Sequence, residues 1–190
     1  MLKFEDDFEK REWLGRQALL EIQKLYPNYF KYQLQFTTGK YDKYDCYYIV
    51  LDEQLNIKKR VIVELKIRDR YFDEYILEQK KYNSLIKIRE DLGLTKDEMN
   101  ILYINLCVDG TYVYDIDRLE LKWDTLIANK ATCDSRTNKV KKSVLYLTKT
   151  SGKFIPYIIS EKQLLIDNII EEKIEQSKKE IKKGLNHLFD

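Results

Sequence analysis

The 190-residue chain has few of the residues that mark several common classes of protein. It contains three cysteines, two prolines, six glycines and one histidine. Because Cys46, Cys107 and Cys133 are odd in number and widely spaced, they predict neither a disulfide framework nor a Cys-x-x-Cys metal clip, and they suit reduced thiols. No stretch approaches the ~20 apolar residues of a membrane span, and the amino terminus has no apolar signal core. We therefore expect a cytoplasmic protein without a membrane partner.

An excess of charge of one sign is also missing. The 34 Lys and Arg residues and 32 Asp and Glu residues leave a formal net charge of +2, so any nucleic-acid surface must come from segregated charge. The composition, 44% hydrophobic and 13% aromatic, is that of a globular protein. We expect residues 1–190 to form a single domain, with a core over about residues 5–116 and a carboxyl-terminal extension over about residues 117–190.

The periodicity of apolar residues predicts an alternation of helices and strands. Helices are expected over residues 5–25, 73–92 and 161–189. Strands are expected over residues 32–38, 45–51, 61–67, 100–108, 111–116, 143–148 and 154–159. Asp109-Gly110 is the signal for a type I′ hairpin, and the last two strands are expected to pair across Ser151-Gly152. Residues 117–140 show only a loose pattern.

The most informative stretch is a strand-like apolar segment that carries a carboxylate and an amine two positions apart. Side chains alternate between the two faces of a strand, so Glu64 and Lys66 project to one side while Val61 and Val63 project to the other. Asp45 stands at the start of the preceding expected strand. If the two strands are neighbours, Asp45 lies beside Glu64.

An aspartate that opens one strand, followed by Glu-x-Lys on the next, resembles the PD-(D/E)XK nuclease superfamily. The resemblance covers roughly residues 45–66 and the order of the elements around them, and the proline of the motif is absent. It implies an α/β (α+β) restriction-endonuclease-like fold with an αβββαβ core, in which helices flank a mixed central sheet. Here a carboxyl-terminal helix is expected to follow.

The same resemblance implies a metal-dependent DNA nuclease that leaves a 5′-phosphate and a 3′-hydroxyl. Asp45, Glu64 and the backbone carbonyl of Leu65 would hold Mg²⁺ or Mn²⁺, because hard oxygen ligands suit these ions. Lys66 would hold or deprotonate the attacking water, or meet the phosphate as a point charge. We expect an endonuclease in preference to an exonuclease.

The superfamily also points to two additions on the helices. Several members place a further acidic ligand on the first helix, and Glu12 is the candidate here, with Glu9 as the alternative. The recombination-type exonucleases carry a glutamine and a tyrosine on the helix after Glu-x-Lys. Gln79 and Tyr82 are similar, although the usual spacing is one residue longer.

Two features of the extension bear on partners. A basic stretch is a candidate for following a DNA backbone; it contains Arg136, Lys139, Lys141 and Lys142. The expected helix over residues 161–189 has enough apolar positions either to pack on its own sheet or to pair with a second copy of the chain, which makes a homodimer possible.

Each of these features also has an ordinary structural interpretation. Glu64 and Lys66 can be the solvated face of an antiparallel strand, paired across it with Asp45 or Lys43. A second triplet, Glu120-Leu121-Lys122, shows how easily the pattern arises, and we expect it to be surface. The alternative function is a non-catalytic nucleic-acid-binding or protein-interaction domain on the same scaffold.

Overall fold

The computed structural model describes residues 7–26, 34–37, 42–68, 72–129 and 138–157. The expected helix over residues 161–189 lies outside these ranges, as do Arg136 and Cys133. Within them, no helix has the length and apolar character that crossing a membrane requires. Cys46 and Cys107 are free and buried.

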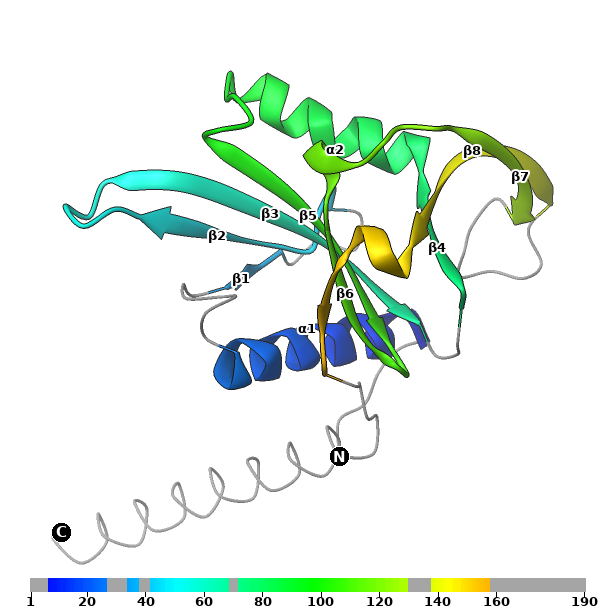
Figure 1. Cartoon of the computed structure of the whole chain (residues 1–190), viewed down its shortest axis with the longest axis horizontal. Coiled ribbons are helices and arrows are strands. Elements are labelled where there is room, and N and C mark those ends of the chain that lie inside the picture. Colours follow the sequence, from blue (N-terminus) through cyan, green and yellow to red (C-terminus); the bar gives the residue numbers. More distant parts are fainter. Residues whose placement is uncertain (1–6, 27–33, 38–41, 69–71, 130–137, 158–190) are drawn as a thin grey trace, which may run out of the picture.

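The described chain alternates between helices and strands (Figure 1). In order, its elements are α1 (Asp7–Leu25), β1 (Gln35–Phe36), β2 (Cys46–Leu51), β3 (Ile57–Arg68), β4 (Glu74–Glu78), α2 (Gln79–Asp91), β5 (Met99–Cys107), β6 (Gly110–Asp115), the 3-10 helix η1 (Ile116–Arg118), β7 (Asp124–Asn129), β8 (Lys139–Thr148), the 3-10 helix η2 (Lys149–Ser151) and β9 (Lys153–Ile155).

The strands of the described residues form two sheets. The larger has six strands in the order β1-β2-β3-β5-β6-β9, and the smaller has three in the order β4-β8-β7. β3 and β5 are parallel, joined by a crossover through α2, while the other neighbours in the larger sheet are antiparallel. The expected mixed α+β fold with an αβββαβ order is thus confirmed, with β4 inserted before α2.

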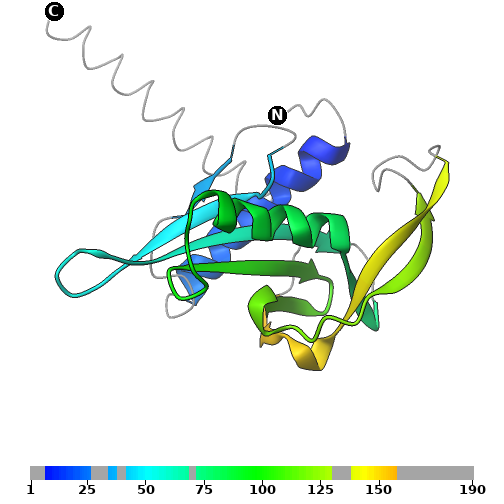
Figure 2. The same ribbon diagram turned by 90° about the horizontal axis from the view of Figure 1, so that it is seen from above.

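The larger sheet is covered on both faces (Figure 2). α1 lies against one face, where Leu19 and Ile22 pack with Val61 and Val63 of β3. The other face is covered by α2 and the smaller sheet, where Ile62 of β3 is buried. Alternation along β3 therefore assigns its odd-numbered residues to the α1 face and its even-numbered residues to the α2 face.

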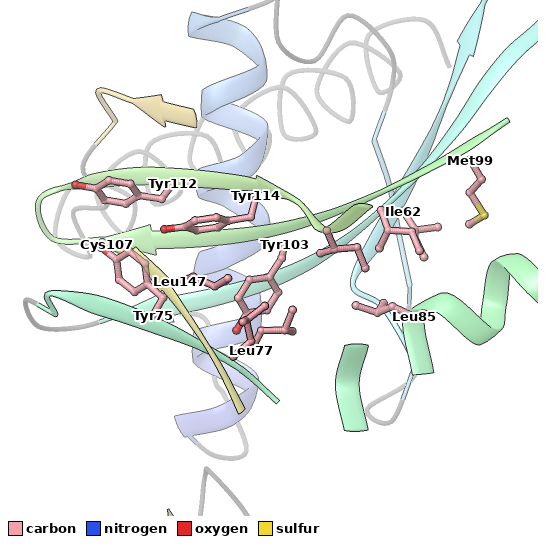
Figure 3. Packing of buried hydrophobic residues seen from close by; sticks show 13 residues of the cluster. Ile62, Tyr75, Leu77, Leu85, Met99, Tyr103, Cys107, Tyr112, Tyr114 and Leu147 are labelled. Atoms are coloured by element: carbon pink, nitrogen blue, oxygen red, sulfur yellow. The ribbon is translucent and has the colours of Figure 1, made fainter. Parts of the chain in front are cut away.

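Tyrosine dominates the core on the α2 face (Figure 3). Tyr75 of β4, Tyr103 of β5 and Tyr114 of β6 are almost completely buried. The ring of Tyr75 contacts that of Tyr112 at 5.3 Å between centroids and that of Tyr114 at 6.3 Å. The abundant tyrosines of this face thus tie the smaller sheet to the larger one.

The expected helix over residues 73–92 is wrong in its first part. Glu74–Glu78 is strand β4, and α2 starts only at Gln79. Tyr75 and Leu77 are buried while Glu74, Ile76 and Glu78 are less so, which is the two-residue period of a strand. Antiparallel pairing with β8, from Glu74↔Thr148 onward, holds this segment extended.

The expected strand pair across Ser151-Gly152 is also wrong. β8 starts at Lys139 and pairs with β4 and β7, whereas β9 pairs with β6 in the larger sheet. The turn η2 carries the chain from one sheet to the other, so these two strands have different neighbours. β7 itself lies within residues 117–140, where the sequence showed only a loose pattern.

The hairpin between β5 and β6 is confirmed, but its turn differs from the expected one. Cys107 pairs with Gly110, so the loop residues are Val108 and Asp109, one position earlier than predicted. Among described residues other than glycine, only Leu55 has a positive φ, so Asp109 does not form the expected type I′ turn. Gly110 itself has a φ of +143°.

Candidate active site

The antiparallel register of β2 and β3 brings Asp45 opposite Glu64. Cys46 pairs with Val63, and Asp45, one residue before β2, donates its backbone N–H to the Val63 carbonyl at 2.9 Å. The carboxylate of Asp45 accepts the backbone N–H of Leu65 at 2.5 Å. Since Glu64 precedes Leu65 and shares the α2 face with Asp45, the two carboxylates face the same space. The sequence-based expectation of neighbouring strands is met.

Glu64 is a carboxylate inside the protein, with only 1% of its surface exposed. Its Oε1 atom accepts from Lys66 Nζ at 2.6 Å and lies 3.0 Å from Lys81 Nζ of α2. Its Oε2 atom is buried and has no hydrogen-bond partner among the described residues. A buried carboxylate is costly unless its charge and lone pairs are satisfied, so one oxygen of Glu64 is compensated and the other is not.

Burial and the charge of Glu64 raise the proton affinity of Asp45. Burial, followed by the charge of Glu64, raises the pKa of Asp45 to about 6. Lys66, Lys81 and the Leu65 N–H oppose this shift without cancelling it. At neutral pH Asp45 is therefore ionised against the preference of its surroundings, which favour either a proton or an added cation.

Lys66 is held in its charged form. Burial lowers the pKa of its ammonium, but the Glu64 carboxylate, Tyr103 and Asp45 raise it by more, so the net direction is upward. Lys66 Nζ is thus a positively charged donor beside two carboxylates. In this arrangement it carries a proton that it does not readily release.

The donor set fits a divalent cation in part. Asp45 and Glu64 supply carboxylates, and Glu64 Oε2 is an uncompensated oxygen in a buried position. The N–H and C=O of one strand residue point to the same neighbouring strand, so the Leu65 carbonyl faces the Asp45 side as its N–H does. Within the described ranges, no group of three or more His, Cys, Asp or Glu side chains is placed to hold a metal ion. A cation here would complete its shell with backbone oxygen and water.

The three additional helix residues lie on α1 and α2. Glu12 is on α1, against the opposite face of the sheet, and forms an ion pair with Arg16 at 3.6 Å. Gln79 is the first residue of α2. Tyr82 packs edge-to-face on Trp123, with 5.4 Å between ring centroids. None of the three is among the largest influences on the pKa of Asp45 or Lys66.

The basic stretch is divided by the alternation of β8. Lys139 and Lys141 are exposed. Lys142 has a side chain only 12% exposed and pairs with Glu78 at 2.7 Å, next to the start of α2. Lys142 therefore joins β8 to β4. In the described part of the basic stretch, the charge that faces solvent belongs to Lys139 and Lys141. The second triplet is surface as expected, since Glu120 and Lys122 pair with each other while both are almost fully exposed.

Lys81 is the member of the cluster that sequence reasoning missed. It lies in the first turn of α2, where the positive end of the helix dipole disfavours a lysine unless a carboxylate is near. Its Nζ also donates to the Lys43 carbonyl at 3.5 Å, so it spans from α2 to the chain before β2. The sequence did not reveal a lysine in a first helical turn, because the expected helix began at residue 73 and so placed Lys81 in its middle.

Comparison with known proteins adds a distant likeness in fold. The chain is similar to the 1.6 Å resolution structure of Archaeoglobus fulgidus Hjc, a Holliday junction resolvase from an archaeal hyperthermophile. The two are 14% identical, with a TM-score of 0.45, over 77% of this chain and 92% of that one. No protein-family model matches the sequence, and no curated protein matches it. At this identity and TM-score the likeness carries no argument about activity, which depends on the geometry of the site.

Proposed function

We propose that this chain is a metal-dependent DNA nuclease with Asp45, Glu64 and Lys66 at the centre of its site. The observation that supports the proposal most is the buried carboxylate of Glu64, which lies beside Asp45 and keeps one oxygen without a partner. A strand residue with no function beyond folding has no need of a buried, half-satisfied charge. An acid pair with a lysine on the same face suits metal-dependent hydrolysis of a phosphodiester.

Asp45 and Glu64 would hold Mg²⁺ or Mn²⁺, together with the Leu65 carbonyl. Such an ion, when bound, activates water and neutralises the charge that develops on the phosphate. The Leu65 N–H fixes one oxygen of Asp45 at 2.5 Å, which leaves the other to face Glu64. Lys66 and Lys81 hold Oε1 of Glu64 and so keep its carboxylate oriented.

Lys66 is proposed to act as a charged donor. Because its neighbours raise the pKa of its ammonium, it retains its proton and can donate to a phosphate oxygen or orient the attacking water. This favours two of the roles that the sequence left open over deprotonation of the water. The bond broken would leave a 5′-phosphate and a 3′-hydroxyl, and we favour an endonuclease.

A second candidate function is supported by the same cluster. Two lysines on one oxygen of Glu64 make a charge-compensated group that needs no metal. Such a group suits a non-catalytic nucleic-acid-binding or protein-interaction domain that keeps this scaffold. The two candidates differ in whether DNA is cut.

Cleavage of plasmid and oligonucleotide DNA by the full chain in Mg²⁺ tests the proposal. We expect Asp45→Asn and Glu64→Gln each to lower the rate at least about 100-fold, or ~2.7 kcal/mol of transition-state stabilisation. Lys66→Ala should lower turnover and keep metal-induced stabilisation, because its proposed role lies in the transition state. The matched control is Glu120→Gln. Glu120 begins the second Glu-Leu-Lys triplet, which lies on the surface.

Two results would contradict the nuclease. One is equal cleavage by Glu64→Gln and Glu120→Gln. The other is full activity in EDTA. Lack of cleavage by the unaltered chain on duplex, flap and four-way-junction substrates, with DNA binding retained, would favour the non-catalytic candidate.

A further inference from the structure

The row of polar side chains on β3 does not stop at Lys66. Glu64, Lys66 and Arg68 occupy every second position of β3, so all three lie on the α2 face. The parallel neighbour β5 places Asn105 opposite Lys66 and Tyr103 opposite Glu64. The acid cluster therefore continues along the sheet into a second group made of Arg68, Asn105 and Tyr103.

The guanidinium of Arg68 is held from three sides. Its Nε donates to Asn105 Oδ1 at 3.1 Å, and one terminal nitrogen makes a longer contact of 3.5 Å with the Tyr103 hydroxyl. Its central carbon lies 5.8 Å from the centroid of the Phe72 ring. These contacts order a long side chain before any ligand arrives, which lowers the entropic cost of binding one.

Asn105 has a donor to spare. The residue has no exposed surface, and its Oδ1 accepts from Arg68, while its Nδ2 is buried without a hydrogen-bond partner in the described part of the chain. Buried donors of this kind call for a partner. Since Nδ2 is a donor, its missing partner is an acceptor.

The charge balance also points to an anion. Glu64 is shared by Lys66 and Lys81. Arg68 forms no ion pair with any described carboxylate. A guanidinium that is ordered and yet has no counter-charge is suited to a phosphate, whose oxygens match its fork of donors.

We propose that Arg68, positioned by Asn105 and Tyr103, is a second phosphate subsite, which takes the backbone phosphate next to the one under attack. The proposal rests on the nuclease function proposed above. It adds the path of the bound DNA strand, which would run from the acid pair toward the carboxyl end of β3. Lys66 and Arg68 lie about 6.6 Å apart along the strand, similar to the separation of neighbouring phosphates in one nucleic-acid chain.

The salt dependence of DNA binding tests this assignment. Binding of a fluorescein-labelled mixed-sequence duplex to the full chain is measured by anisotropy in EDTA, from low to moderate NaCl. Each phosphate contact contributes about 0.9 to the slope of log K against log salt. We expect Arg68→Gln to weaken binding and flatten the slope by close to one unit, and Arg68→Lys to weaken binding with the slope retained, because it keeps the charge and loses the fork.

The matched control is Arg60→Gln. Arg60 lies on the same strand and the same face of β3, four side chains back from Arg68, and the substitution removes the same charge. It should leave the slope unchanged. Asn105→Asp supplies Arg68 with a carboxylate partner, so it should flatten the slope as Arg68→Gln does. A merely structural role would shift the melting temperature of these variants and leave the slope alone.

Equal slopes for Arg68→Gln and Arg60→Gln would overturn the subsite. Its failure is distinguishable from failure of the nuclease, because binding is measured without cleavage. Cleavage that depends on Glu64 together with equal slopes would remove the subsite and keep the nuclease. A slope that depends on Arg68 in a chain that cuts no DNA would keep the subsite and remove the nuclease.

Discussion

The two acidic residues at the centre of the site are brought together by backbone pairing rather than by attraction. The register Cys46↔Val63 forces Asp45 beside Glu64, and the strand burial that surrounds them removes water. Two like charges in a poorly hydrated space destabilise the folded state unless a proton or a cation is added. This gives the site a pH dependence whose sign can be worked out.

We predict that Asp45→Asn stabilises the metal-free protein above pH 7. The pKa of Asp45 is raised to about 6 in the fold, so its contribution to stability is complete below its ordinary pKa near 3.8 and is lost as the pH rises through 6. At pH 7.5 the neutral amide should gain on the order of 1–2 kcal/mol, or a melting temperature higher by about 3–6 °C. The measurement is a thermal melt in EDTA, which at pH 4 should show no gain.

Asp52 supplies a control of opposite sign. It is partly exposed and accepts the backbone N–H groups of Gln54 and Asn56, and these bonds, the one to Asn56 first, lower its pKa. Its ionised form is favoured in the fold, so Asp52→Asn should lower the melting temperature at pH 7.5. A higher melting temperature in both variants, or in neither, would contradict the inference that the ionised acid pair destabilises the fold.

At the level of elements, the sequence predicted best what depends on neighbours along the chain. The apolar alternation of β2, β3, β5 and β6 and the helical period of α1 are local, and each was found close to its expected place. β4 was misread because Tyr75 and Ile76 also fit helical spacing, and only pairing with β8, some 70 residues later, holds the segment extended. A non-local partner decided its conformation.

The candidate site divides in the same way. Asp45, Glu64 and Lys66 could be found from the sequence, because two-residue spacing on a strand and one hairpin connection place them together. Lys81 and Asn105 could not. The position of Lys81 depends on where α2 begins, and that of Asn105 on the parallel register of β3 and β5. The local periodicity of the sequence predicts neither feature.

The hairpin between β5 and β6 gives an element-scale prediction. Gly110 has a φ of +143°, and a Cβ there would collide with the ring of Phe154 on β9. Gly110→Ala should therefore destabilise the protein through both backbone strain and loss of the β6–β9 contact, by about 2–4 kcal/mol. Urea unfolding followed by circular dichroism measures the change.

Gly93 is the matched glycine. It also has a positive φ, +66°, but a Cβ there would meet nothing within 4 Å. Gly93→Ala should cost only the backbone term, about 1 kcal/mol. Equal losses in the two variants would mean that the packing of Phe154 against Gly110 contributes nothing.

On the scale of the whole molecule, the site lies where three separate layers meet. The larger sheet supplies the acid pair and α2 supplies Lys81, while β4 of the smaller sheet runs directly into α2 after Glu78. A ligand that draws on the carboxylates thus acts on contacts between layers. Its binding should be visible in the stability of the entire fold.

We predict that divalent cations raise the melting temperature of the full chain at pH 7.5. A ligand present at 100 times its dissociation constant adds about 2.7 kcal/mol, which for a chain of this size corresponds to roughly 5–10 °C. Mg²⁺, Mn²⁺ and Ca²⁺ should all stabilise, because all take oxygen ligands, while only Mg²⁺ and Mn²⁺ should support cleavage. The shift should shrink at pH 5, where Asp45 must first lose its proton. Asp45→Asn and Glu64→Gln should abolish it, and Glu120→Gln should retain it. An equal shift in all four proteins would place the cation elsewhere on the molecule and leave Glu64 as the charged partner of two lysines alone.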